Sequence, residues 1–266
     1  QHFAYGHYHW PMGRYVDELL ADHKFVGGRG VVEYLRLRAR DRFTPIPTGL
    51  ISMDRLRGSL RPRTTPQSAG RRIVYAPSCD FKNNLYFSYY RRSCTEQFEI
   101  QRTILGALGK ARDAQVIVKC YSAPEMLPIW GALTRWVKTQ GWAHVQVTRT
   151  GILADHLKNA DIVILDGLTT ALFEAIASPA QVIVFNDIFR VEPAAKKLLE
   201  QRVVLEGDID RFNRLIDRFC SGEDVAPGPD AGATFLKEYA TFQEDGLSYS
   251  RIAAALESIV MDGKKA

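Results

Sequence analysis

Short apolar runs alternate with longer amphipathic segments through residues 72–219. The runs are rich in valine and isoleucine, which favour strands, and the segments between them repeat apolar residues at helical spacing. The pattern predicts strands over residues 73–76, 115–119, 145–148, 161–165, 181–186 and 203–206. It predicts helices over residues 96–110, 128–140, 152–159, 169–177, 193–201 and 210–219. Buried strands joined by helices indicate an α/β protein with a doubly wound parallel sheet.

The first part of the chain predicts only a portion of such a layer. Residues 1–13 are typical of a loop. A helix over 15–22, a strand over 24–27, a helix over 31–40 and a strand into Thr48-Gly49 follow, as in the closing βαβ portion of a Rossmann-like domain. Because no structural element leads the chain, we expect a segment of a longer polypeptide. Two more helices, over 233–243 and 249–261, are predicted at the end.

The segment over residues 161–175 is the most informative stretch. It reads as a strand, a tight turn at Asp166-Gly167, and a helix that begins near Thr169 and Thr170. A helix N-terminus carries free N–H donors and partial positive charge, so a diphosphate or phosphodiester can bind there. The alternative is that one threonine only caps the helix.

Polar residues also follow the other predicted strands, at 77–80, 120–122, 149–151 and 186–187. Ligands of open parallel sheets bind beyond the carboxyl ends of the strands, which favours a polar ligand with phosphates and sugar hydroxyls. The alternative is that these loops are polar because they lie at the surface. Lys119 either neutralises phosphate charge or ends a buried strand, and Glu174 faces either the ligand or the solvent.

Two common nucleotide-binding motifs are absent from the sequence. Neither G-x-G-x-x-G after the first strand nor G-x-x-x-x-G-K-[ST] occurs, so a dehydrogenase or a P-loop NTPase is not expected. Residues 27–30, Gly-Gly-Arg-Gly, fit neither spacing, and we favour a turn over a ligand contact there.

The histidines near the start do not form a metal motif. His2, His7 and His9 lack a recognisable carboxylate or cysteine partner, so we expect no metal site. A loop histidine is better suited to accept a proton from an attacking hydroxyl, because its ordinary pKa lies near neutrality.

Composition narrows the class of protein further. The 266 residues include four cysteines with no C-x-x-C pair, so zinc and disulfides are not expected and a cytoplasmic protein is the default. The net charge is +5, with many arginines between residues 29 and 72. These could attract nucleic acid, anionic lipid or a phosphorylated acceptor, but we favour a solvated helix and linker, and we expect no nucleic acid partner.

Several motifs together resemble those of GT-B glycosyltransferases. Residues 73–78, Ile-Val-Tyr-Ala-Pro-Ser, resemble the strand that opens the donor domain of CDP-glycerol glycerophosphotransferases and related surface-polysaccharide transferases. Residues 161–175 resemble their strand, hydroxyl pair and Glu-bearing helix, and residues 181–185 the following strand. Residues 1–6 resemble the Gln-His-Gly loop of an acceptor domain, and residues 47–54 the strand that leaves it.

The resemblance implies a domain organisation and a set of roles. It implies the C-terminal part of an acceptor-side Rossmann-like domain at 1–54, a linker at 55–70, a nucleotide-donor domain at 71–222 and C-terminal helices at 223–266. His2 is the implied catalytic base, Ser78 lies near the donor phosphates or the cleft, and Glu174 binds a ribose or sugar hydroxyl. The residues implied to bind the donor phosphates are Thr169 and Thr170. Gly167, in the same turn, and Lys119 are also expected to bind the donor.

The expected function is transfer of a glycosyl or glycerophosphoryl group from a nucleotide-activated donor to a polysaccharide or lipid-linked acceptor at the cell surface. No cofactor is required, because hydroxyls and backbone N–H groups can stabilise the leaving phosphate. The enzyme would be cytoplasmic, either free or peripheral on the inner face of the cell membrane, and this segment alone could be inactive. A UDP-sugar epimerase of the same fold and a non-catalytic nucleotide- or polysaccharide-binding module stay open as alternatives.

Overall fold

The chain divides into two compact units. We describe them from a computed structural model that covers residues 22–39, 43–56, 70–78, 93–122 and 127–263. The first unit comprises Gln1–Ser59, Arg190–Leu199 and Gly232–Ala266, and the second comprises Leu60–Phe189 and Glu200–Ala231.

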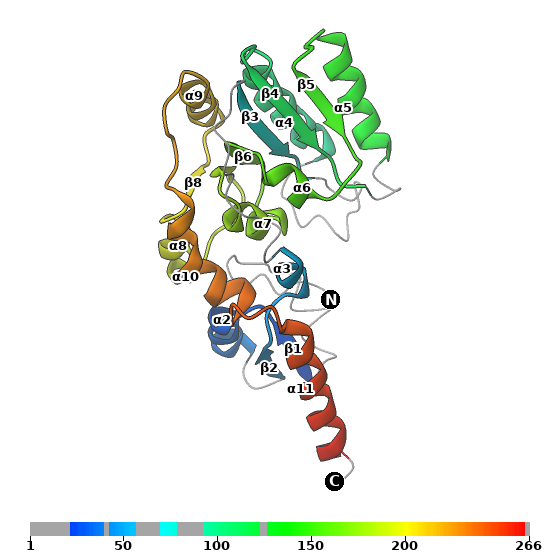
Figure 1. Cartoon of the computed structure of the whole chain (residues 1–266), viewed down its shortest axis with the longest axis vertical. Coiled ribbons are helices and arrows are strands. Elements are labelled where there is room, and N and C mark those ends of the chain that lie inside the picture. Colours follow the sequence, from blue (N-terminus) through cyan, green and yellow to red (C-terminus); the bar gives the residue numbers. More distant parts are fainter. Residues whose placement is uncertain (1–21, 40–42, 57–69, 79–92, 123–126, 264–266) are drawn as a thin grey trace. The chain divides into compact units, whose positions relative to one another are not determined.

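The second unit is built on a parallel six-stranded sheet (Figure 1). Its strand order is β5-β4-β3-β6-β7-β8, so the chain moves outward from β3 in one direction and then outward from β6 in the other. This is the doubly wound order of Rossmann folds. The strands are β3 (Arg71–Ala76), β4 (Ala114–Lys119), β5 (Val145–Thr148), β6 (Ile162–Leu165), β7 (Gln181–Phe185) and β8 (Val203–Glu206).

Helices cover the two faces of this sheet. Side chains of α4, α5 and α9 form a hydrophobic core with one face of the sheet. The helices α6 and α7 lie outside this core and contact the strands and each other. Ile73, Ile162 and Ile183 on the central strands are fully buried, which explains why the sequence shows apolar runs instead of alternation. The helices are α4 (Cys94–Leu108), α5 (Leu127–Thr139), α6 (Leu153–Leu157), α7 (Ala171–Ala177) and α9 (Ile209–Cys220).

A buried arginine closes the amino ends of two strands in this unit. Arg202, directly before β8, is fully buried and donates hydrogen bonds to the carbonyls of Ser178, Ala180 and Pro227. Burial lowers its pKa to about 10. The guanidinium therefore serves as a fixed donor for carbonyls that the sheet leaves unpaired.

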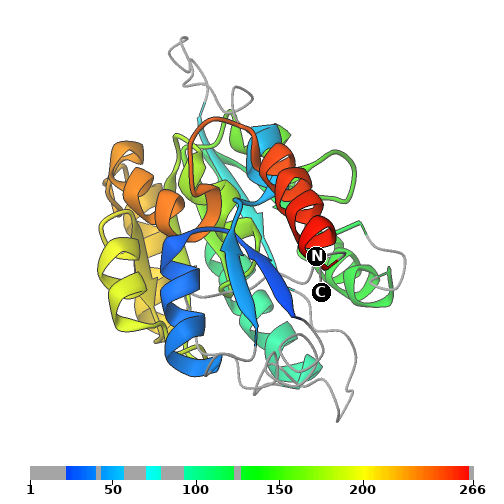
Figure 2. The ribbon, with the colours of Figure 1, turned by 90° about the horizontal axis from the view of Figure 1, so that it is seen from below.

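The first unit contains a two-stranded parallel sheet, seen in Figure 2 with α2 beside it. Pro45 and Pro47 of β2 cannot donate hydrogen bonds, while Thr44 N and Thr48 N donate to β1 and its flank. One edge of β2 is therefore unsuited to a further strand. The elements of this unit are β1 (His23–Val26), α2 (Arg29–Ala39), β2 (Thr44–Pro47), α3 (Ile51–Leu56), α8 (Pro193–Leu199), α10 (Ala233–Leu236), η3 (Lys237–Thr241) and α11 (Ser248–Gly263), with η2 (Pro229–Gly232) leading into α10.

Glycines let the turn after β1 pack directly on η3. A Cβ on Gly27 would overlap the carbonyl of Tyr239, and one on Gly28 would overlap the carbonyl of Glu238. A Cβ on Gly30 would lie 2.7 Å from the Tyr239 ring. The glycine-rich turn is thus explained by backbone packing, in agreement with the interpretation as a turn.

The start of α11 is held by a residue from far earlier in the chain. Asp54 on α3 accepts hydrogen bonds from Ser248 N and Ser248 Oγ, both at 2.8 Å. Arg251 then donates to Thr48 O at 2.8 Å and pairs with Asp245. A carboxylate at a helix N-terminus satisfies its free N–H groups and complements its dipole.

The boundaries differ from the expected ones in several places. Arg55 and Leu56, expected in the linker, belong to α3, and Gly70 lies directly before β3. The C-terminal helices and α8 group with the first unit instead of forming a separate segment or joining the donor domain. The helix expected over 233–243 is interrupted, because α10 continues as the π-helical turn η3. The helix expected over 15–22 lies outside the described residues, apart from its last residue.

We expect Gly28→Ala to destabilise the first unit by about 1–3 kcal/mol, the usual effect of overpacking. The added methyl group would meet the backbone of Glu238, which cannot rotate away as a side chain could. Denaturant unfolding, followed together with hydrogen exchange of η3, measures the change.

Gly106→Ala provides the matched control. Gly106 lies within α4, and a Cβ there would have nothing within 4 Å. Because alanine is the better helix former, this variant should gain about 0.5–1 kcal/mol. Equal stability of Gly28→Ala and the wild type would contradict the packing described here.

Candidate functional site

The site lies where the winding of the second unit reverses. β3 and β6 are neighbours, with Ala76 paired to Leu165, and the chain leaves these two strands in opposite directions. From Pro77 the chain continues to β4 on one side, and from Asp166 it continues to β7 on the other. In open α/β sheets this switch point is where ligands bind.

A buried carboxylate lies at the centre of the switch point. Asp166 is 2% exposed and accepts hydrogen bonds from Tyr75 Oη at 2.7 Å and from Ser78 N. Two amides on α4 also donate to it, Gln97 Nε2 at 3.0 Å and Gln101 Nε2 at 3.2 Å. Burial raises the pKa of Asp166, and the hydrogen bonds from Ser78 and Tyr75 act in the opposite direction. Groups that donate on every side suit an ionised carboxylate, which only accepts.

The same groups hold Ser78 on three of its atoms. Asp166 accepts from its backbone N, Gln101 Nε2 donates to its carbonyl O at 2.7 Å, and Gln97 Nε2 donates to its Oγ at 3.1 Å. A Cβ on Gly167 would lie 3.5 Å from Ser78 Oγ, so the two loops touch. The position of Ser78 is thus fixed relative to both strands.

Local sequence explains why α4 presents both amides to the sheet. Ser93 and Glu96 form a capping box that fixes where the helix begins. Gln97 and Gln101 are spaced four residues apart on the buried face, in line with Ile104, Leu105 and Leu108. The amides are therefore carried to the end of β3 by an apolar helix face.

Lys119, the last residue of β4, lies one strand away from Ser78. Its side chain is buried, and Nζ donates to Cys120 O at 2.9 Å and Arg149 O at 3.5 Å. Burial lowers the pKa of Lys119, while Cys120 and Glu174 act in the opposite direction. The ammonium thus ends a buried strand and is also close enough to interact with a carboxylate.

Glu174 on α7 is the carboxylate that interacts with Lys119. It is half-buried, and burial raises its pKa while the charge of Lys119 lowers it. Two oppositely charged groups with perturbed pKa values at one strand edge are a frequent sign of a functional site.

The two threonines open α7 without capping it. Thr170 is the N-cap residue, yet it has helical backbone angles and makes no side-chain capping hydrogen bond. Both threonines are half-buried, and their carbonyls accept from Leu172 N and Phe173 N. The interpretation that the Thr170 hydroxyl caps the helix is therefore not supported.

The structure brings most of the sequence-predicted residues to one edge. Ser78 follows β3, and the turn of Gly167 and Thr169 follows β6. Lys119 is the last residue of the adjacent strand β4, and Thr170 and Glu174 lie at the start of α7. His2, the expected catalytic base, lies outside the described residues.

Sequence reasoning missed the residues that support the site. These are Tyr75, Gln97 and Gln101, together with the buried role of Asp166.

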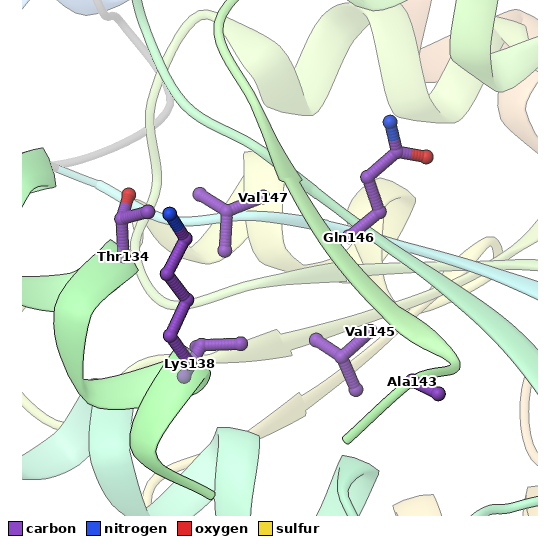
Figure 3. Close-up of a pocket in the computed structure, with 7 residues that line it drawn as sticks. Thr134, Lys138, Ala143, Val145, Gln146 and Val147 are labelled. Carbon is purple, nitrogen blue, oxygen red and sulfur yellow. The ribbon is translucent and has the colours of Figure 1, made fainter. Parts of the chain in front are cut away.

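A separate hollow of about 380 Å³ lies beside the edge strand β5 and is lined by α5, β5 and the segment between them (Figure 3). Thr134 and Lys138 supply polar side chains to it, and Val145 and Val147 supply apolar wall, while the side chain of Gln146 points to the other side of β5. None of the sequence-predicted site residues lines it. It therefore does not extend the switch-point site.

The described part of the chain shows neither a cluster of metal ligands nor a membrane-spanning helix. Among those residues, no group of three or more His, Cys, Asp or Glu side chains is arranged to hold a metal ion. Within the same residues, no helix is long and apolar enough to cross a membrane.

The chain is similar to solved structures, although its sequence matches no family model and no curated protein. S. aureus MnaA, solved with UDP, is 11% identical, with a TM-score of 0.60 over 91% of this chain and 61% of that chain. A putative UDP-N-acetylglucosamine 2-epimerase from Listeria monocytogenes is 17% identical, with a TM-score of 0.55 over 92% and 61%.

Sucrose-phosphate synthase from Thermosynechococcus elongatus is similar as well, at 15% identity and a TM-score of 0.53 over 91% of this chain and 60% of that chain. The chain spans about three-fifths of the length of these structures. Likeness at such identities establishes the fold, and the chain has the GT-B fold. The predicted fold class is thereby confirmed.

We expect Lys119→Met to raise the pKa of Glu174 further. Burial raises that pKa and the Lys119 charge opposes it, so removing the charge leaves burial alone. Glu174 should then stay protonated to a higher pH, which NMR titration of its carboxyl carbon measures.

Lys158→Met is the control for this titration. Lys158 is an exposed lysine that pairs with Asp155 at 3.0 Å and lowers the pKa of that carboxyl. The control variant should raise the pKa of Asp155 and leave that of Glu174 in place. An unchanged Glu174 titration in Lys119→Met would show that the two groups do not interact.

Proposed function

We propose that the chain is the nucleotide-donor portion of a GT-B enzyme that acts on a nucleotide-activated sugar or glycerol. The observation that carries the proposal is the cluster of polar groups on the carboxyl ends of β4, β3 and β6. MnaA is described with UDP and has the highest TM-score among the structures compared above, which supports a uridine nucleotide as the first ligand to test.

The proposed roles follow the positions of the side chains. The hydroxyls of Thr169 and Thr170 and the backbone around Gly167 bind the donor phosphates. Glu174 accepts hydrogen bonds from a ribose or sugar hydroxyl, as a carboxylate does. The charge of Lys119 lowers the pKa of Glu174 against the effect of burial and adds positive charge beside the phosphates.

Ser78 and His2 complete the proposed set. Ser78 lines the donor site next to Gly167, where its backbone is fixed by Asp166 and Gln101. His2 is the proposed general base, which takes the proton from the attacking acceptor hydroxyl. The acceptor is a polysaccharide or lipid-linked glycan, and the enzyme works in the cytoplasm or on the inner face of the membrane.

An epimerase is the second candidate, and a specific observation favours it. The Listeria monocytogenes structure is described as a putative UDP-N-acetylglucosamine 2-epimerase, and one from Methanocaldococcus jannaschii, with a TM-score of 0.52, is described with UDP-N-acetylglucosamine and UDP. Such a reaction needs the same donor site and no acceptor. The transferase is preferred here for the motifs over residues 73–78 and 161–175.

Incubation with UDP-N-acetylglucosamine alone separates the two reactions. A transferase leaves the sugar configuration unchanged until an acceptor is added, whereas an epimerase converts the sugar nucleotide by itself. The measurement is NMR of the sugar anomeric and C2 protons over time. Conversion without an acceptor would replace the transferase proposal by the epimerase one.

We expect the double variant Thr169→Val with Thr170→Val to weaken UDP binding at least tenfold, a loss of about 1.4 kcal/mol. Valine keeps the shape of threonine and removes both hydroxyls, so the helix start is preserved. Isothermal titration of UDP, CDP and GDP, each with the wild type and the variant, measures the change.

A double variant away from the site controls for the loss of two hydroxyls. Thr103 and Thr134 donate to helix carbonyls within α4 and α5, so Thr103→Val with Thr134→Val should bind UDP as the wild type does. Nucleotide affinity that is equal in both double variants would remove the threonines from the proposed donor site.

A further inference from the structure

We propose that Asp166 is a positioning residue of the donor site: with Gln97 and Gln101 it fixes the Ser78 loop against the Gly167 turn. The inference rests on the proposed function, because it assigns the residue that shapes the donor site. Asp166 is only 2% exposed, so it is too deeply buried to contact a ligand itself.

The first step of the argument is the convergence of donors on one carboxylate. Oδ1 accepts from Ser78 N, and Oδ2 accepts from Tyr75 Oη, Gln97 Nε2 and Gln101 Nε2. These donors come from β3, from the loop after it and from α4, while Asp166 itself follows β6. One side chain therefore joins β3, the residue Ser78 after it, and α4 to the end of β6.

The second step concerns the charge. The carboxylate has no cationic hydrogen-bond partner among the described residues, and only neutral N–H and O–H groups surround it. Buried ions without a counter-ion are costly and are kept where their hydrogen bonds are complete. An apolar residue would fill this position at lower cost if packing alone were needed.

The third step is the fixed orientation of Ser78. Gln97 and Gln101 each bridge Asp166 and Ser78, so the carboxylate also fixes the amides that hold the Ser78 hydroxyl and carbonyl. Loss of the carboxylate would free all three atoms of Ser78 together. A donor site built on this loop would lose its shape while the sheet below it stays folded.

The test uses Asp166→Asn in the full chain, with UDP as the probe. The hydrogen-bond partners of the Asp166 carboxylate among the described residues are all donors, so residue 166 must accept on both oxygens. The asparagine NH2 group places a donor against these donors, and Ser78 should detach from residue 166. We expect UDP affinity to fall at least tenfold and the Ser78 amide to exchange with solvent faster than in the wild type. Titration calorimetry and hydrogen exchange give the two readouts.

Arg202→Gln is the matched control. Arg202 is another buried charge of the same unit that holds backbone groups, but it lies at the amino ends of β7 and β8. This variant should lower the melting temperature and leave UDP affinity within about twofold, a difference below 0.5 kcal/mol. If both variants weaken UDP binding in proportion to their loss of melting temperature, Asp166 is only structural and the proposal is overturned.

Gln101→Met keeps the proposal testable if Asp166→Asn does not fold. Methionine preserves the length of the side chain and removes the bond to Ser78 O, so UDP affinity should fall about fivefold. Wild-type affinity and slow exchange of Ser78 in a folded variant would overturn the proposal. If the wild type binds no nucleotide but Ser78 exchange responds as expected, the proposed function fails and the positioning of the loop stands.

Discussion

A carboxylate taken out of water needs donors on every side, and this requirement organises the carboxyl end of the sheet in the second unit. Asp166 has such donors only because β3, the loop after it and α4 all converge on the residue that follows β6. Each donor that satisfies the charge is thereby placed as well. The arrangement of the candidate site is thus a consequence of hydrogen-bond completeness, since an unsatisfied buried ion would cost several kcal/mol.

The regular half of the fold could be predicted because its signal is local. Buried parallel strands require apolar, β-branched runs. The strands predicted to end at Lys119, Thr148 and Glu206 end at the same residues in the structure. The first unit was harder to predict, since its elements depend on distant partners. α3 is short and its Asp54 binds Ser248, while the change from α10 to η3 occurs where Gly27 and Gly28 press against the backbone.

The candidate site divides in the same way. Ser78 and Thr169 could be proposed from sequence because they follow predicted strands, and Lys119 because it ends one. Topology alone brings such residues together. The hydrogen bonds that hold Ser78 could not be predicted, because they depend on which face of α4 meets the switch point. A signal was present in the sequence: Gln97 and Gln101 interrupt an otherwise apolar stripe at a spacing of four, and a polar pair on a buried face requires a buried partner.

The two ends of the sheet use buried charge to opposite effect. At the amino ends, Arg202 is fully buried and donates to the carbonyls of Ser178, Ala180 and Pro227. At the carboxyl ends, Asp166 is buried too, but Thr169, Thr170 and Glu174, which follow it along the chain, are only half-buried. A rigid base beneath partly exposed polar groups is what ligand recognition requires, because groups held in place lose little further freedom on binding. This asymmetry supports the proposal that the ligand binds at the carboxyl end of the sheet.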